Sequence, residues 1–284
     1  MRTYVPAVVN PARTIFTDYS AHRGSLASGG MAYFVLLAIA PAAVFIGAVA
    51  GALIGPEDAR SAIESLLIRV PALGPEFQPS ADALLKVMTT ASAGAVTVTS
   101  IVSLLIAIYA ASKAIMALRL ALDAAFDFVG VRHGLLGRLR DAVLTLVGLL
   151  VVVTLMLVLT LLPRILRAAG ITDFHVTTGI GWIDWLVFGV LAWGLVLALY
   201  RWVPSRRAPV TWRSPVALAV AIWLLGVSAG VGAYVGFSST IGAAIAAFGA
   251  PMVVLLWLYL SFMGVLIGAE AQMNLIGLRG SESD

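Results

Sequence analysis

The longest segment without an ionisable side chain sets the strongest limit on how this chain can fold. Residues 214–269 contain no Asp, Glu, Lys, Arg or His over 56 positions, and Glu270 ends the run. Such a segment cannot form the surface of a water-soluble domain, in which about 25% of residues are charged. In the whole chain only 11% of residues are charged and 61% are apolar. The sequence therefore predicts a membrane protein.

Six membrane-spanning helices account for the uncharged stretches. A spanning helix needs about 20 apolar residues, so the longest stretch supplies two helices and four shorter ones supply one each. A barrel is disfavoured because its strands alternate apolar and polar residues, whereas "LTLVGLLVVVTLMLVLTLL" is apolar on every face. We predict an all-α, polytopic membrane protein. It has a lead (1–23), one transmembrane domain (24–277) and a tail (278–284), with spans at about 25–54, 93–111, 142–162, 182–202, 216–236 and 251–276.

Helices are also predicted outside the spans. Apolar residues recur at helical spacing between Ile63 and Val70, which indicates that residues 57–90 form an outer amphipathic segment in the membrane interface. The helix of the second span is expected to continue beyond the membrane as a cytoplasmic helix over residues 113–128. The lead is expected to end in an interfacial helix. Pro251 is predicted to be the first residue of the last helix.

The distribution of basic residues predicts the orientation in the membrane. Of the 18 Lys and Arg residues, 13 fall in the lead, the second and fourth connections and the tail, and five fall in the other connections. By the positive-inside rule, both termini are therefore cytoplasmic. The net charge of +4 is then a topology signal. Anionic lipid headgroups at the cytoplasmic basic loops are the expected partners, and no nucleic acid is expected.

Several motifs resemble the YihY/BrkB family of bacterial inner-membrane proteins. They include "SLASGGMAYFVLLAIAPAAVF" in the first span, "IYAASKAIMALRLALDAAFDF" after the second and "LLWLYLSFMGVLIGAEAQMNL" in the last. The resemblance covers about residues 15–277. It implies a six-helix inner-membrane protein of envelope integrity that exports or flips lipids or other amphiphiles. The name ribonuclease BN, often attached to the family, is regarded as a mistaken assignment. Asp123 stands where an asparagine is common in the family.

No enzyme site is expected. "GVSAG", Gly226–Gly230, matches the G-x-S-x-G nucleophile motif, but that motif works at a strand-to-helix turn. Here it lies inside a predicted span, where Gly226 and Gly230 are expected to form a packing face, and catalysis by Ser228 is disfavoured. Cysteine is absent, and the three histidines lie in connections without the spacing of metal ligands. We expect no catalytic residue, no metal and no cofactor.

Glu270 is the main candidate site residue. It lies 19 residues after Pro251, about 28 Å along a helix, near the inner edge of a hydrocarbon core about 30 Å thick. One interpretation is a structural ion pair with a basic residue of the cytoplasmic side. The other is that Glu270 lines the inner opening of a substrate path, coupling to a proton or holding a cationic group. Asn274 shares its helix face, and the ion-pair candidates are Lys113, Arg119 and Arg23.

Tyr33 and Tyr109 supply hydroxyl groups in the middle of two spans. They are candidates for the same path, although packing with the hydroxyl bonded to a backbone carbonyl is the alternative. Gly264 and Gly268, just before Glu270, allow close approach of another backbone. The sequence thus favours a carrier that exports or flips a lipid or another amphiphile, with a non-transporting membrane scaffold as the alternative. No nucleotide-binding motif is present, so active transport would need an ion gradient or a partner; assembly as a homo-oligomer stays open.

Overall fold

In the computed structural model, most of the predicted spans are helical. Six helices are described, and the described residues contain no β-strand. The predicted third span (142–162) and the outer amphipathic segment (57–90) lie outside the described residues, apart from Val143 and Glu57. The described residues are 11–55, 57, 98–128, 143, 182–206, 208, 210–238 and 243–281.

Four of the six helices can cross a membrane. The helices α2, α5, α8 and α9 each contain a segment that is long and apolar enough, and α7 contains a shorter apolar segment. Only 22–33% of the residues in those four segments are buried inside the protein, so most of their apolar side chains face outwards, where lipid stabilises them. The helices are α1 (Pro11–Ala21), α2 (Gly24–Ile54), α5 (Val98–Ala125), α7 (Trp182–Trp202), α8 (Pro215–Ser238) and α9 (Ala243–Ser281).

Helix α5 joins the predicted second span and the predicted cytoplasmic helix without a break, as expected, and ends at Ala125. Its end is a Schellman motif. The N–H of Phe128 donates to the carbonyl of Asp123 at 2.8 Å, and the N–H of Asp127 donates to that of Ala124 at 3.1 Å. Asp127 adopts the left-handed conformation, with φ 53°, which aspartate tolerates better than most residues. The motif turns the chain away from the helix axis.

Helix α9 begins eight residues before Pro251, so the prediction that Pro251 starts this helix is wrong. The preceding segment, residues 243–250, is rich in alanine, the residue with the highest helix propensity. Proline removes one backbone hydrogen bond inside a helix, but membrane helices tolerate it because the local structure satisfies the freed carbonyl. The helix therefore continues through Pro251.

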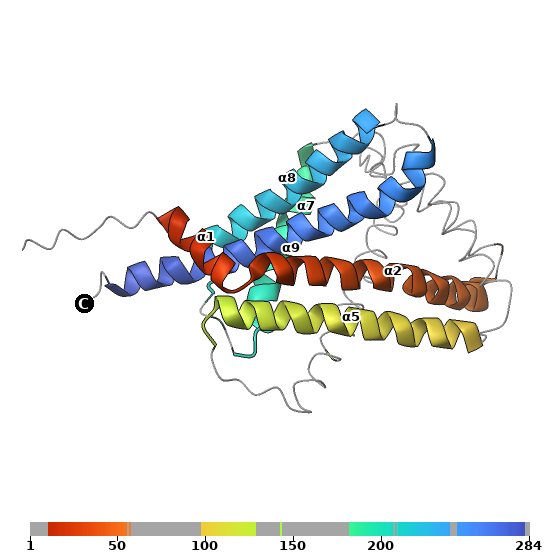
Figure 1. The fold of residues 1–284 in the computed structure, drawn as a ribbon, viewed down its shortest axis with the longest axis horizontal. Helices are drawn as coiled ribbons and strands as arrows, with labels where there is room; N and C mark the ends of the chain where they lie inside the picture. The colour runs from red at the N-terminus through yellow and green to blue at the C-terminus, as the bar shows by residue number, and fades with distance from the viewer. Residues whose placement is uncertain are drawn as a thin grey trace, which may run out of the picture.

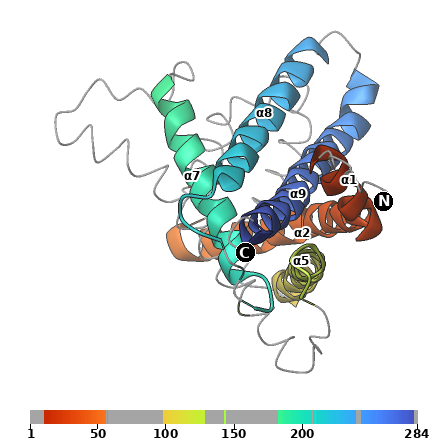
Figure 2. The ribbon, with the colours of Figure 1, turned by 90° about the vertical axis from the view of Figure 1, so that its left-hand side faces the viewer.

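The helix ends gather at one end of the molecule, called here the convergent end. It holds the start of α2, the ends of α5, α7 and α9, and the start of α8, while the opposite ends diverge (Figure 1). The buried core lies at this end, where Met31, Leu122, Tyr200, Val216 and Leu266 belong to one cluster. Helix α2 runs beside α5, and α9 beside α8 (Figures 1 and 2).

Helix α9 packs closely on its neighbours through Gly264 and Gly268. A Cβ atom at Gly264 would overlap the indole ring of Trp223, and one at Gly268 would overlap Val220 and the hydroxyl of Tyr200. Side chains of α7 and α8, rather than another backbone, therefore occupy the space that these glycines leave. The indole N–H of Trp223 donates to the carbonyl of Leu260 at 3.0 Å and fixes the ring there.

The prediction that Gly226 and Gly230 form a packing face is wrong for the part of the chain that the structure describes. Both glycines of α8 are exposed, and no described residue lies within 4 Å of a Cβ atom built at either position. The rotation of α8 about its axis explains the difference, since the helix turns Val220 and Trp223 towards α9 instead.

Candidate functional site

The turn between α1 and α2 places His22 against α9. Helix α1 ends with the N–H of His22 donating to the carbonyl of Asp18 at 2.9 Å. Arg23 then adopts the left-handed conformation, with φ 55°, and its carbonyl accepts the N–H of Ala27 in the first turn of α2, at 3.0 Å. This two-residue turn bends the chain between α1 and α2, and the imidazole of His22 lies beside Glu270 of α9.

Glu270 is buried against His22. The carboxylate oxygen Oε1 lies 2.7 Å from Nδ1 of His22, and only 4% of Glu270 is exposed. When Glu270 is ionised, its carboxylate only accepts hydrogen bonds, and Nδ1 of His22 then carries the proton in this contact. The contact becomes a full ion pair when Nε2 of the imidazole is also protonated. The carboxylate is therefore paired with a side chain whose charge can change.

The structure pairs Glu270 with His22, a residue that the sequence did not single out as a partner. Arg23 is exposed in the turn next to His22, and Arg119 is buried within α5. The ammonium group of Lys113 lies 5.2 Å from the ring centroid of Tyr109, a cation–π contact. Sequence distance gave no reason to prefer His22, which is 248 positions away from Glu270.

Asp18 and Asn274 extend the contact into what is called here the His22–Glu270 cluster, comprising Asp18, His22, Glu270 and Asn274. The side-chain amide of Asn274 donates to the Glu270 carbonyl at 3.0 Å and reaches Oδ2 of Asp18 at 3.5 Å. The carboxylates of Asp18 and Asp127 are close enough to interact electrostatically with Glu270. Carboxylates thus outnumber the single imidazole, an arrangement that favours a proton or a cationic group.

Hydroxyl groups line the neighbouring contact between α1, α2 and α9. The hydroxyls of Ser25 and Tyr259 lie 2.8 Å apart and link α2 to α9. Tyr19 packs its ring where a Cβ atom of Gly24 would stand, which explains why the second helix starts with glycine. Burial raises the pKa of the Tyr19 phenol above its ordinary value, so this hydroxyl stays neutral. The region beside the cluster is polar but uncharged.

Tyr33 and Tyr109, the other path candidates, are not brought to this cluster. Their side chains are 56% and 61% exposed on the outer faces of α2 and α5. Tyr33 packs edge-on against the ring of Phe34. Of the predicted path residues, the structure therefore joins only Glu270 and Asn274.

Two further polar contacts at the convergent end involve Ser205, Ser214 and Gln272, which the sequence did not single out. Asp123 accepts hydrogen bonds from the N–H of Ser205 at 2.7 Å and from its hydroxyl at 2.5 Å. The hydroxyl of Ser214 caps α8, accepting the N–H of Ala217 at 3.2 Å, and donates to Gln272 of α9 at 2.5 Å. The sequence did contain a signal for these hydrogen bonds, because the connection after α7 is rich in proline and contains serines. Serine side chains often form hydrogen bonds to nearby backbone groups at turns and at helix starts.

Ser228 is engaged in helix contacts. Its hydroxyl donates to the carbonyl of Leu224 at 2.8 Å and accepts the indole N–H of Trp257 at 3.1 Å. The first bond lies within α8 and the second links α8 to α9. Among the described residues, no group of three or more His, Asp or Glu side chains could hold a metal ion.

Comparison with known proteins gives the family. The profile of the family described as "Virulence factor BrkB" matches residues 15–278. The chain belongs to the BrkB family. The chain is also 26% identical over 269 residues to the "Putative ribonuclease-like protein YfkH" of Bacillus subtilis (strain 168), with 91% of this chain and 92% of that relative covered. No solved structure matches it. The family match spans the His22–Glu270 cluster.

Proposed function

We propose that this BrkB protein is a bacterial inner-membrane carrier that exports or flips a lipid or another amphiphile and couples this movement to protons. The observation that carries the proposal is the 2.7 Å contact between His22 and Glu270. An ionisable residue within a membrane segment is costly and most often serves a path or a relay. Its partner here is a histidine from the short turn before α2.

The type of partner separates a proton-coupled role from a purely structural one. An ion pair that only holds helices together is best made with arginine or lysine, whose charge does not change near neutral pH. Histidine changes its charge in that range, so the attraction across the His22–Glu270 contact depends on protonation. Because the contact joins the α1–α2 turn to α9, its loosening would weaken the attachment of α1 to α9. We therefore expect the helices of the convergent end to adopt one arrangement when the pair is neutral and another when it is charged.

The proposal includes six spans with both termini in the cytoplasm. Support comes from the convergent end, which gathers α1, the end of α5, the end of α7 and the start of α8 (Figure 1). These are the segments that the basic residues assign to the cytoplasm. Four helices are long and apolar enough to span; α7 and the third predicted span complete the proposed six.

Reporter fusions test this topology. A fusion after Asp284 is expected to report the cytoplasm, and a fusion at Gly74 is expected to report the opposite compartment, because an odd number of spans separates the two positions. Paired alkaline phosphatase and fluorescent protein activities measure the compartment. The same compartment for both positions would show that six spans with this orientation are wrong.

We propose no catalytic role for Ser228, because its hydroxyl is used in helix contacts. Anionic lipid headgroups at the basic connections remain the proposed partners, with no role for nucleic acid. A homo-oligomer is compatible with the exposed apolar faces of α2, α5 and α8.

A membrane scaffold for envelope integrity is the second candidate function. It is favoured by the close packing of α9 through Gly264 and Gly268, where the side chains of Trp223, Val220 and Tyr200 leave no room for even one more carbon atom. A solid bundle of this kind would present surfaces to other envelope proteins without moving a substrate.

Reconstitution separates the two functions. The purified protein is placed in vesicles of phosphatidylglycerol and phosphatidylethanolamine with a trace of fluorescent lysophospholipid, and the transfer of the probe between leaflets is followed by dithionite quenching. A carrier is expected to speed transfer at least several-fold over empty vesicles, and more when a pH gradient is imposed. A scaffold is expected to give the empty-vesicle rate with and without the gradient, which would refute the transport proposal.

A further inference from the structure

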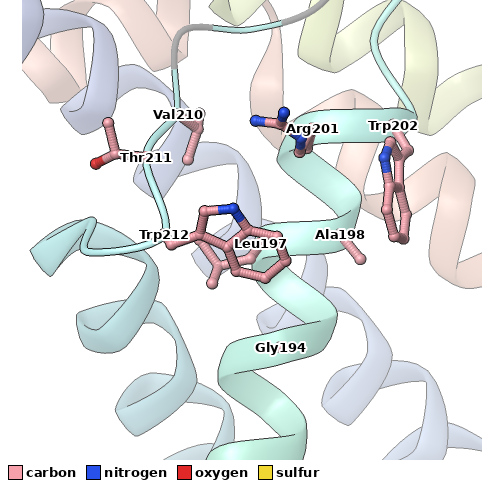
Figure 3. Close-up of a pocket in the computed structure, with 8 residues that line it drawn as sticks. All are labelled: Gly194, Leu197, Ala198, Arg201, Trp202, Val210, Thr211 and Trp212. Atoms are coloured by element: carbon pink, nitrogen blue, oxygen red, sulfur yellow. The ribbon is translucent and has the colours of Figure 1, made fainter.

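A groove on the far side of the convergent end lies apart from the His22–Glu270 cluster. It has a volume of about 110 Å³ and is lined by the last turns of α7 and by the connection to α8. Figure 3 shows the guanidinium of Arg201 directed towards the connection that carries Val210, Thr211 and Trp212. The His22–Glu270 cluster is formed instead by α1, α9 and the turn before α2.

The groove changes from apolar to polar along α7. Gly194, Leu197 and Ala198 form the apolar part, and Arg201 with Thr211 forms the polar part. Seven residues of helix separate Gly194 from Arg201, a rise of about 10 Å. No described residue lies within 4 Å of a Cβ atom built at Gly194, so this part of the groove is open. A ligand that fits both parts has an anionic group at one end and hydrocarbon at the other.

The charge of Arg201 has no partner in the described chain. Neither a hydrogen bond nor an ion pair connects its guanidinium to another described residue. Arginine binds phosphate with several hydrogen bonds at once. Beside it, the exposed rings of Trp202 and Trp212, at 60% and 65%, are of the kind that lies at the level of lipid headgroups. Position and charge together favour a lipid phosphate.

We infer that this groove is a binding site for an anionic phospholipid, with the phosphate on Arg201 and an acyl chain along Gly194 and Leu197. The site goes beyond the proposed transport, because its residues are separate from the His22–Glu270 cluster and a lipid can occupy it whether or not the protein moves a substrate. The lipid would fix the connection between α7 and α8 at the membrane surface.

Native mass spectrometry of the purified full-length protein tests whether Arg201 binds the lipid headgroup. Phosphatidylglycerol is compared with phosphatidylcholine of the same acyl chains. The wild type is expected to bind phosphatidylglycerol preferentially, and Arg201→Gln is expected to weaken that binding about tenfold, to the level of phosphatidylcholine. The control Arg213→Gln removes an exposed charge of the same connection that does not line the groove, and it is expected to keep the preference.

Glycine replacements test the hydrocarbon part. Gly194→Leu fills the open end of the groove and is expected to weaken the binding of both lipids. Gly226→Leu adds the same side chain at an open glycine of α8 outside the groove and is expected to change neither. Equal losses in Arg201→Gln and Arg213→Gln, unchanged binding in Gly194→Leu, or displacement of the lipid by excess inorganic phosphate would each overturn the inference. Because the readout is binding, none of these results bears on whether the protein transports.

Discussion

Replacing Gly268 by leucine is expected to destabilise the protein so strongly that little of it accumulates in the membrane. The added side chain would overlap Val220 of α8 and the hydroxyl of Tyr200 of α7. Tyr200 is fully buried and donates a hydrogen bond to the Val265 carbonyl at 2.6 Å, so it cannot move aside without losing that bond. Overpacking and the unpaired hydroxyl together are expected to cost about 3 kcal/mol or more.

Membrane abundance and the loss of the monodisperse peak on heating in detergent measure this effect. Gly268→Ala is expected to be intermediate, because it adds one carbon atom. The matched control is Gly230→Leu, which places the same side chain at an exposed glycine of α8 with open space around it and is expected to behave like the wild type. If Gly268→Leu proved as stable as Gly230→Leu, the packing of α9 described above would be incorrect.

Glu270→Gln is expected to abolish proton-dependent transport while the protein still folds. Glutamine retains an oxygen that can accept the Nδ1–H of His22, so the loss of the charge is expected to cost only about 1–2 kcal/mol of stability. The variant can no longer exchange a proton at position 270. Transfer of the fluorescent lysophospholipid under an imposed pH gradient measures the loss, and it should fall to the rate of empty vesicles.

The variant His22→Lys tests whether the pair needs a positive charge at position 22 or a charge that changes with pH. Lysine keeps a cation next to the carboxylate but does not lose its proton near neutral pH, so this variant is expected to be as stable as the wild type yet insensitive to the pH gradient. The control Ser25→Ala removes the uncharged link of 2.8 Å between α2 and α9 and is expected to keep gradient-dependent transfer. Full gradient-dependent transfer in both Glu270→Gln and His22→Lys would restrict the pair to a structural role.

The partner of Glu270 illustrates what could not be predicted. The expected depth of Glu270 came from counting residues along a helix from Pro251, and that count directed attention to the basic residues of the predicted cytoplasmic side. Lys113, Arg119 and Arg23 were the obvious cations by charge alone. Which side chain faces Glu270 depends on how each helix is rotated about its axis and on the left-handed turn at Arg23. That turn places His22, and not one of these cations, next to Glu270. Neither the rotation nor the turn leaves a local signal in the sequence.

The two glycine pairs illustrate the same limit. Gly226 with Gly230, and Gly264 with Gly268, have the same four-residue spacing, so the sequence assigns both to close packing with equal reason. Among the residues that the structure describes, only the second pair faces neighbouring side chains. The difference arises because α8 presents Val220 and Trp223 to α9 and turns its own glycines outwards. A membrane helix is apolar on all sides, so hydropathy cannot distinguish its packed face from its lipid face.

The sequence by itself determined the class of protein and the location of its apolar helices. The absence of charge over residues 214–269 requires a membrane, and prolines and charges that bound the apolar stretches lie next to the ends of α2 and α7 and to the start of α8. These are local properties of length and hydropathy. Tertiary structure alone decided the His22–Glu270 contact, the packing through Gly268 and the groove at Arg201. Each of these joins segments distant in the chain or depends on helix rotation, and the energies that fix them come from side-chain packing rather than from local sequence.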